Sequence, residues 1–170
     1  MPTAKIKSPK ATRPYMPGYG LPKHKKGMLT WKWATTELAK TREYWIVTVR
    51  PNRAPHMMPV WGLWWDNAFY FSTGAGSRKD RNLAKNAKCV IATQDASKAV
   101  VVEGTAAKLR DVAKIRKFLP LYEKKYKFDM SGMAGDLIAL KQPIFVVRPK
   151  KAFGMVEKTF ATSATRWLFS

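Results

Sequence analysis

One stretch, residues 69–83, constrains the fold of this chain more than any other. It opens with Phe-Tyr-Phe, which alternates at the two-residue period of a strand, and Gly74 and Gly76 follow with the backbone freedom of a sharp turn. Ser77 then has the side chain of a helix N-cap. This order places unpaired backbone N–H groups and the positive end of a helix dipole at the turn. An anion such as a phosphate group is the expected occupant.

Two cations, Arg78 and Lys79, occupy the first turn of the expected helix. A cation at a helix N-terminus opposes the dipole, so the pair costs stability unless something negative lies between them. Arginine offers a planar fork and lysine a compact charge, so together they suit a phosphomonoester held from two sides. Asn82, one turn further on, either hydrogen-bonds the phosphate end or caps a neighbouring strand. The alternative for the whole stretch is a strand, turn and helix whose basic residues are only solvated, and the spacing alone leaves both open.

Four short motifs follow one another along the chain. They are Trp-Ile-Val-Thr-Val-Arg at residues 45–50, Pro-His-Met-Met-Pro-Val-Trp at 55–61, Ser-Arg-Lys-Asp-Arg-Asn-Leu at 77–83 and Val-Glu-Gly-Thr-Ala at 102–106. Together they resemble the pyridoxamine 5'-phosphate oxidase family, the FMN-binding split barrels, and the flavin and deazaflavin oxidoreductases of the same wider group. The resemblance covers residues 44–109 and returns at the C-terminus. It is specific for the fold and says less about the reaction.

The resemblance implies a mainly β fold, a small antiparallel split barrel with peripheral helices. It also implies a homodimer in which each cofactor, FMN or the deazaflavin coenzyme F-420, lies at the interface. The expected cofactor contacts come from the phosphate clamp, from the strand beside the isoalloxazine ring, from the backbone of the loop before the helix, and from a C-terminal tail that reaches the other subunit's cofactor. In that order, the residues are Ser77, Arg78, Lys79 and Asn82; His56, Pro59, Val60 and Trp61; Thr73 and Gly74; and Arg166 and Trp167. His56 is either a hydrogen-bond donor to the ring or ribityl chain, or an ordinary strand histidine.

The chain departs from the pyridoxamine phosphate oxidases proper in two places. Those enzymes carry an Arg-x-Val-Leu-Leu-Lys strand and a C-terminal Arg-x-His, whereas this chain has His-Met-Met-Pro-Val-Trp at residues 56–61 and no histidine near Arg166. Pyridoxamine phosphate oxidation is therefore disfavoured. The sequence is more similar to the flavin and F-420 oxidoreductases, and the anionic oligoglutamate tail of F-420 would suit a basic surface. The predicted function is hydride transfer between FMN or F-420 and a small unsaturated substrate, with a non-catalytic cofactor- or haem-binding protein and a basic nucleic-acid-associated protein as alternatives.

The charge balance is strongly basic. Thirty-two Lys and Arg against eleven Asp and Glu give a formal net charge of +21, which calls for a polyanion, a membrane surface or an anionic ligand. No helix-turn-helix, zinc spacing or aromatic RNA-binding signature accompanies it, so charge permits nucleic-acid binding without sequence preference and no more. No apolar run approaches the roughly 18 residues of a membrane span, and the N-terminus lacks a signal-like apolar region. We therefore expect a cytoplasmic protein.

No set of side chains points to catalysis without a cofactor. His24 and His56 are far apart in sequence and the acids are spread thinly, so we expect no metal site and assign no catalytic residue. A bound flavin would fit this pattern, because the cofactor itself carries the reactive atom. The single cysteine, Cys89, lies in an apolar run and is expected to be a small core residue.

The chain divides into a basic arm, residues 1–29, rich in Pro and Gly, and a cofactor-binding domain, residues 30–170. An arm packed along its own domain or across a dimer mate is favoured over a disordered tail. Pro59 implies that its strand lies at an edge, at a bulge or against a ligand, and Glu103 in an apolar strand is expected to have a cationic or amide partner. The expected helices are 31–40, 77–86 and 111–126, with a loop at 132–135. The expected strands are 44–50, 55–65, 68–73, 88–93, 98–109, 143–148 and 152–157.

Overall fold

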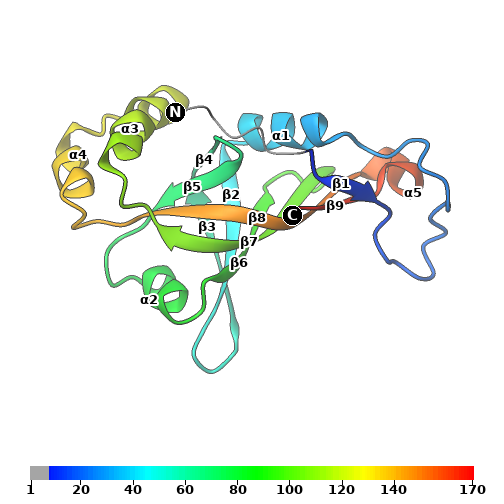
Figure 1. Ribbon diagram of the computed structural model, residues 1–170, viewed down its shortest axis with the longest axis horizontal. Coiled ribbons are helices and arrows are strands. Elements are labelled where there is room, and N and C mark those ends of the chain that lie inside the picture. The colour runs from blue at the N-terminus through cyan, green and yellow to red at the C-terminus, as the bar shows by residue number, and fades with distance from the viewer. Residues whose placement is uncertain (1–7) are drawn as a thin grey trace.

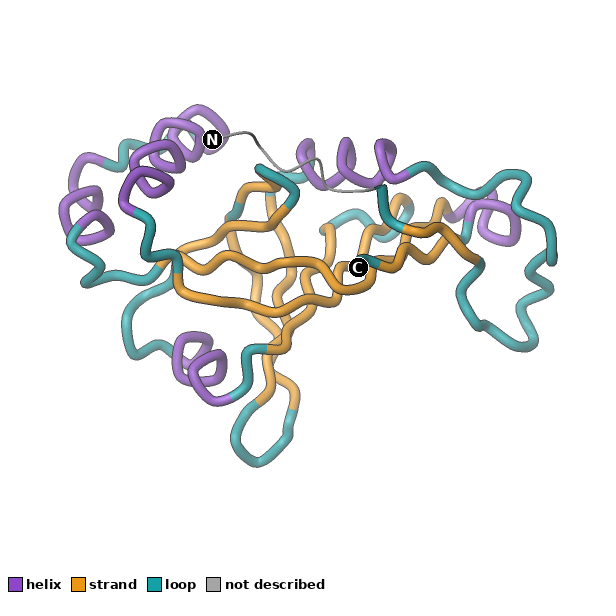
Figure 2. Tube along the Cα trace, in the orientation of Figure 1, coloured by secondary structure: helices purple, strands orange, loops and turns teal. Residues whose placement is uncertain are grey.

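The computed structural model describes residues 8–170, in which a nine-stranded sheet is surrounded by helices (Figures 1 and 2). The strands are β1 (Lys10–Thr12), β2 (Glu43–Val49), β3 (Pro55–Trp61), β4 (Leu63–Trp65), β5 (Ala68–Ser72), β6 (Lys88–Thr93), β7 (Lys98–Lys108), β8 (Ile144–Val156) and β9 (Thr165–Leu168). The helices are α1 (Trp31–Lys40), α2 (Arg78–Lys85), α3 (Val112–Tyr126), α4 (Ser131–Ile138) and α5 (Phe160–Ser163), with a 3-10 turn at Glu157–Thr159.

All strand pairs are antiparallel, in the order β1-β9-β8-β7-β6-β2-β3. The first half of β8 also pairs with β5, which pairs in turn with β4. Across the described residues the path has free ends at β1 and β3, so the sheet curves without closing into a barrel. The expected mainly β fold with helices outside is confirmed. Because β3 ends the path, Pro59 lies on an edge strand, where a missing N–H is tolerated.

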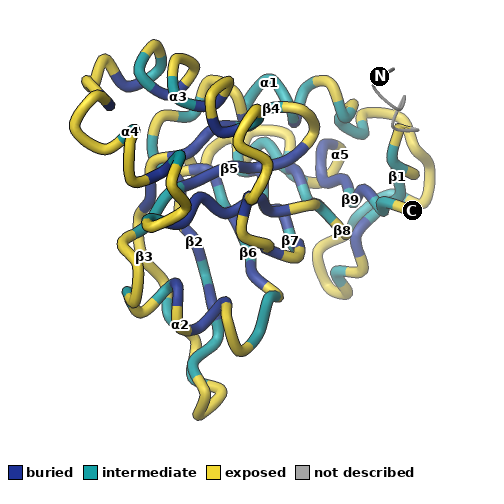
Figure 3. The backbone as a smooth tube through the Cα atoms, turned by 60° about the vertical axis from the view of Figure 1, so that its left-hand side comes forward, coloured by how far each residue is buried: buried dark blue, intermediate teal, exposed yellow. Residues whose placement is uncertain are grey.

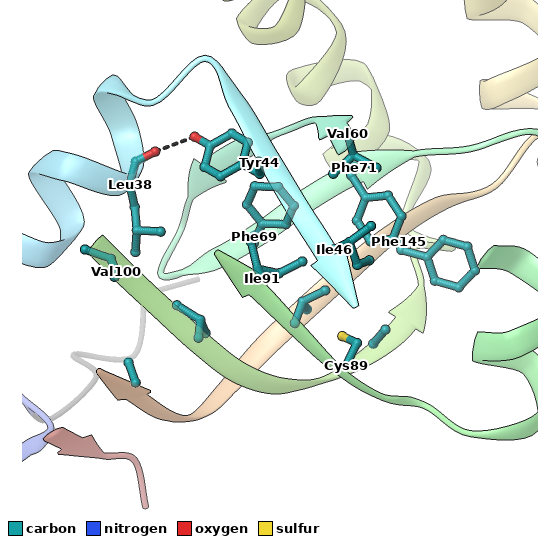
Figure 4. Close-up of a cluster of buried hydrophobic side chains, with 14 of the residues drawn as sticks. Leu38, Tyr44, Ile46, Val60, Phe69, Phe71, Cys89, Ile91, Val100 and Phe145 are labelled. Carbon is teal, nitrogen blue, oxygen red and sulfur yellow. Dashed lines mark hydrogen bonds between the residues drawn. The ribbon is translucent and has the colours of Figure 1, made fainter. Parts of the chain in front are cut away.

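Two apolar cores lie on opposite faces of β5. Phe69 and Phe71 are fully buried inside the curve of the sheet, in a cluster with side chains of β2, β3, β6, β7 and β8 (Figure 4). Tyr70, between them, packs in a second cluster under α3 and α4. A strand that is buried on both faces is anchored by roughly 1.5–3 kcal/mol for each large side chain. β5 therefore delivers the loop that follows it from a fixed position.

The N-terminal arm lies along its own domain. β1 pairs with β9, and the Arg13 guanidinium donates to the carbonyl oxygens of Thr162 (2.7 Å) and Ala164 (3.0 Å). These bonds hold residues 8–29 beside α5 at the end of the sheet away from α2 (Figure 1). Residues 1–7 of the expected arm lie outside the described part.

The expected strand at 55–65 is wrong, because Gly62 divides it into β3 and β4. The Gly62 N–H donates to the Tyr126 hydroxyl (2.7 Å), and its carbonyl accepts from Lys125 Nζ (3.0 Å). Side chains of α3 thus take the place of a strand ladder at this residue. A Cβ here would lie 2.2 Å from Phe69 Cζ, so only glycine fits so close an approach.

Two further expectations are wrong. The predicted strands 143–148 and 152–157 form one continuous strand, β8. Pro149 has no N–H to donate to β7, and the register shift opposite Glu103 and Gly104 lets the pairing of the two strands continue beyond it. The predicted loop at 132–135 is part of α4, where the buried side chain of Leu137 packs in the second core. This packing outweighs the roughly 1 kcal/mol that each glycine costs in a helix. Glu103 does have the expected cationic partner, since Lys151 Nζ lies 3.1 Å from its carboxylate.

Candidate cofactor site

The loop of residues 73–77 joins β5 to α2, and its side chains cap the helix. Ser77 Oγ accepts the Asp80 N–H (3.3 Å) and lies 3.0 Å from Thr73 Oγ1, so the expected N-cap is present. Gly76 has a φ of +70°, in the left-handed region that favours glycine. A Cβ at Gly74 or Gly76 would meet nothing within 4 Å. The loop backbone is therefore open to close approach by a ligand.

The Asp80 side chain holds this loop in place, a role that we did not expect from the sequence. Its carboxylate accepts the Gly76 N–H (2.8 Å) and lies 2.8 Å from Lys108 Nζ on β7. Burial raises the pKa of Asp80, but the hydrogen bonds from Lys108 and Gly76 outweigh burial and the net shift is downward. The Ser-x-x-Asp spacing from Ser77 to Asp80 resembles a capping box, and that signal would have identified the residue.

The first turn of α2 keeps its free donors. The backbone N–H groups of Arg78 and Lys79 have no acceptor in residues 8–170, and no carboxylate of that part lies within 4 Å of either side chain. The only acid of this turn, Asp80, is already bound to Gly76 and Lys108. The turn therefore presents two amides, two cations and a helix dipole to the outside, a combination that suits an anion.

Asn82 lies behind this turn and is fully buried. Its Nδ2 donates to Thr48 Oγ1 (2.9 Å), so of the two alternatives for Asn82 the structure has the bond to a neighbouring strand. Its Oδ1 has no partner among the described residues. Thr48 was also missed by the sequence analysis. It follows Tyr44 and Ile46 at the inward positions of β2, and a polar side chain in such a series indicates a buried partner.

His56 connects β3 to the same group. Its Nδ1 lies 3.4 Å from Thr48 Oγ1. Desolvation first, then the positive charges of Arg50, Lys79 and Arg78, lower the pKa of His56. We call the three cations Arg50, Arg78 and Lys79, together with His56, the cationic corner. At neutral pH the imidazole is uncharged and able to donate one hydrogen bond and accept another.

The other residues expected at the ring face in different directions. Val60 is buried in the first core, and Pro59 is exposed on the edge strand. Trp61 is 36% exposed and stacks on Tyr126 of α3, with ring centres 4.5 Å apart. The Arg42 guanidinium lies 5.5 Å from the centre of the Trp61 ring. Trp61 is thus an exposed aromatic surface that α3 holds in place.

The C-terminal pair lies away from the site of its own chain, and the expectation that it reaches the other subunit's cofactor stays a prediction. Trp167 is 1% exposed in the first core, and Arg166 Nε donates to Thr12 Oγ1 (3.0 Å) in the neighbouring strand β1. Their strand, β9, lies at the far end of the sheet from α2 in two views (Figures 1 and 3).

Other kinds of site find no support in residues 8–170. No three His, Cys, Asp or Glu side chains of this part gather as a metal site would require. None of the helices described is long and apolar enough to cross a membrane. Cys89 is buried, as expected, and burial raises the pKa of its thiol to about 12.

An open, curved antiparallel sheet with peripheral helices defines a split-barrel protein, and here a helix N-terminus with free donors follows its doubly buried strand. The family model described as pyridoxamine 5'-phosphate oxidase matches residues 33–155. The chain belongs to this family. A search of curated proteins found no match.

Solved structures agree on the fold. The chain is similar to a conserved hypothetical protein from Mycobacterium tuberculosis, with a TM-score of 0.64, 16% identity, and 73% of this chain and 82% of that chain covered. It is similar to an F420 reductase, with a TM-score of 0.56, 20% identity, and 69% and 93% covered. It is also similar to HutZ, a haem storage protein from Vibrio cholerae, with a TM-score of 0.52, 15% identity, and 70% and 87% covered.

Proposed function

We propose that this protein is a homodimeric oxidoreductase that binds FMN or coenzyme F-420 and transfers a hydride to or from a small unsaturated substrate. The observation that carries the proposal is the first turn of α2, where Arg78 and Lys79 have free amides and free side-chain charges beside the open loop at Gly74 and Gly76. Both coenzymes carry a phosphate group that fits such a turn. When bound, the coenzyme supplies the atom that accepts or gives the hydride.

The residues of the chain divide the remaining work. Arg78 and Lys79 neutralise the phosphate. Arg50 belongs to the same cationic corner, since its charge lowers the pKa of His56. Asp80 holds the Gly76 amide and so fixes the loop that the ligand approaches. His56, uncharged and half-exposed, offers a hydrogen bond to the polar part of the ligand beyond the phosphate. Its orientation comes from Thr48 and, through Thr48, from the buried Asn82.

The dimer is proposed from the outer face of β2 and β3. Trp45 is 37% exposed and Met57 51% exposed, and the register places Trp45 opposite Pro59 and Met57 opposite Val47 on this face. Large apolar side chains gathered on one exposed face indicate a contact with another molecule. A second copy would cover the same face of its partner. Of the cationic corner, Arg50 directly follows β2 and His56 lies on β3, whereas Arg78 and Lys79 lie on α2. A second copy on these two strands would therefore lie beside the coenzyme.

The clamp is tested by titrating FMN, and separately F-420, into the purified protein at fixed salt. Arg78→Ala should weaken binding by about 2 kcal/mol, roughly 30-fold, at the low end for loss of one partner of a charge pair because the arginine is exposed in the free protein. Lys85→Ala, at the other end of the same helix, removes the same charge far from the first turn and should leave the affinity within about twofold. Equal affinity of wild type and Arg78→Ala would remove the phosphate from this turn.

The dimer is tested by sedimentation velocity. Wild type should sediment as a dimer and Trp45→Glu as a monomer, because the carboxylate would be buried without a partner at the interface, at a cost of several kcal/mol. Tyr15→Glu places the same charge on another exposed aromatic position, 86% exposed, and should remain dimeric. A monomeric wild type, or a dimer that Trp45→Glu does not disturb, would refute this interface.

The likeness to a haem storage protein favours one second candidate, a haem-binding split barrel without turnover. The absorption spectrum of the protein loaded with each group separates the candidates. Two visible-range bands indicate a bound flavin, a single band a deazaflavin, and a Soret band haem. A Soret band with no affinity for FMN or F-420 would replace the oxidoreductase proposal by this second one.

A further inference from the structure

A cavity lies on the other side of the sheet from α2. It has a volume of about 750 Å³ and lies between the start of α1, the β4–β5 turn, α3, the middle of β8 and the end of β9. In Figure 1, α1 and α3 lie above the sheet and α2 below it. None of its described lining residues belongs to the cationic corner or to the loop of residues 73–77. This cavity is therefore separate from the proposed coenzyme site.

Aromatic rings make up much of its wall. They are Trp31, Trp65, Tyr70 and Phe169. Each is held by another: the ring centres of Trp31 and Phe169 are 4.9 Å apart and nearly perpendicular, and those of Trp65 and Tyr70 are 5.1 Å apart. Trp31 also packs against Trp64 and Trp167 of the first core. Because the rings are fixed by these contacts, a flat apolar ligand would enter at little cost in side-chain entropy.

The same wall carries an excess of positive charge. Arg148, Lys117 and Lys150 line the cavity, and no carboxylate in the described part of the chain lies within 4 Å of any of them. Lys114 is paired with Asp66, 3.0 Å away, and Asp66 has the only acidic side chain among the described lining residues. Gathered cations repel one another, and an anionic ligand would relieve this repulsion.

Tyr70 gives the cavity a neutral polar group. The residue is 2% exposed, but its hydroxyl has no hydrogen-bond partner in residues 8–170 and is not among their enclosed, unpartnered atoms. Burial raises the pKa of this phenol, against the opposing charges of Lys114 and Arg148. The hydroxyl therefore stays protonated and available to a ligand beside these two cations.

We propose that this cavity is a second ligand site, which takes a planar aromatic molecule that bears a phosphate or carboxylate group. Its volume lies within the roughly 300–1,000 Å³ of small-molecule sites. The rings contact the flat part of the ligand, and Arg148 with Lys117 binds the anion. The proposal is independent of the coenzyme function, since neither set of residues contributes to the other site.

Calorimetric titration with matched probes tests the proposal on the full-length protein. Adenosine 5'-monophosphate and 4-hydroxybenzoate are the aromatic anions; adenosine and phenol are their counterparts without the anionic group. At least one anion should bind about tenfold more tightly than its counterpart. The double variant Arg148→Gln, Lys117→Gln should weaken that binding at least about tenfold, whereas Arg78→Ala, Lys79→Ala should leave it within about twofold. Circular dichroism checks that both variants are folded.

Three results would overturn the proposal. The first is no binding of either anion at millimolar concentration. The second is equal binding of an anion and its uncharged counterpart, which would remove the role of the cations. The third is that the Arg78, Lys79 variant loses binding while the Arg148, Lys117 variant keeps it, which would place the probe at α2. Trp65→Leu is a further check on the aromatic wall. It should lower the affinity for the anion that binds, and an unchanged affinity would contradict a role for the rings.

Discussion

Removal of the Asp80 carboxylate is expected to loosen the loop before α2. The Gly76 N–H that it accepts is a hydrogen bond to a charged group, worth about 1.5–3 kcal/mol. The Lys108 side chain is 42% exposed, so its ion pair with Asp80 adds at most about 1 kcal/mol. Asp80→Ala should therefore lower the free energy of unfolding by about 2–3 kcal/mol, which for a chain of this size is roughly 4–12 °C in Tm.

Two further variants divide this loss. Asp80→Asn keeps an acceptor for Gly76 but not the charge, so it should cost about 1 kcal/mol. Lys108→Gln removes only the exposed partner and should cost less than about 1 kcal/mol. Urea unfolding of the four proteins gives the order directly. Equal stability of wild type and Asp80→Ala, or a larger loss in Lys108→Gln than in Asp80→Ala, would refute the assignment of the loop to this carboxylate.

The pH dependence gives an independent check. The folded-state pKa of Asp80 lies below its usual value of 3.8, so the carboxylate binds fewer protons in the folded protein than in the unfolded one. Its contribution is therefore complete above that value and is lost as the pH falls through the folded pKa. The stability difference between wild type and Asp80→Asn should be constant at neutral pH and close in acid. A difference that persists at the acid limit would show that charge is not its cause.

Two other predictions concern neighbouring residues. In an NMR titration, the pKa of His56 should lie below 6.5, and it should rise in Arg78→Ala, in Lys79→Ala and on addition of FMN, because each change removes or neutralises positive charge nearby. As the pH falls, His56 is protonated in the unfolded chain before it is protonated in the folded one. The loss of stability therefore appears as the pH falls through 6.5. A value unmoved by either variant would contradict the cationic corner. Gly62→Ala should destabilise by about 1–3 kcal/mol or more, because its Cβ would lie 2.2 Å from Phe69 Cζ. Gly132→Ala, where a Cβ meets nothing within 4 Å, is its control in urea unfolding, and equal effects would refute the close approach.

The sequence predicted those elements whose signals are local. Ser77 as an N-cap and the strand at residues 88–93 follow from single-residue chemistry and from period-two alternation, and both are present. The sequence predicted a strand that continues to Trp65, but the structure interrupts it at Gly62. The hydrogen-bond partners of the Gly62 backbone come from α3, more than sixty residues later. A contact of that kind leaves no trace in the local pattern.

The site shows the same division. The position of Arg78 and Lys79 on the first turn of α2 was predicted because a helix N-terminus is visible in the sequence, and their role at a cofactor stays a prediction. Asp80 and Thr48 were missed because each matters through a partner on another strand or loop, Lys108 and His56 among them. Trp167 lies in the core of its own chain, and the expectation that it reaches the other subunit's cofactor stays a prediction.

The polar groups around α2 fall into two sets, and the division says which end of a ligand this chain specifies. Ser77, Asp80 and Asn82 are bound to groups of the fold, and their removal should affect stability before affinity. Arg78 and Lys79 remain free, and both are cations. Under the proposed function, a first turn that keeps two cations and two backbone N–H groups free would select the anionic end of its ligand and leave the rest to other surfaces. If the protein binds a coenzyme as proposed, substitutions of Trp61, whose exposed ring lies on β3, should change the substrate without changing the coenzyme.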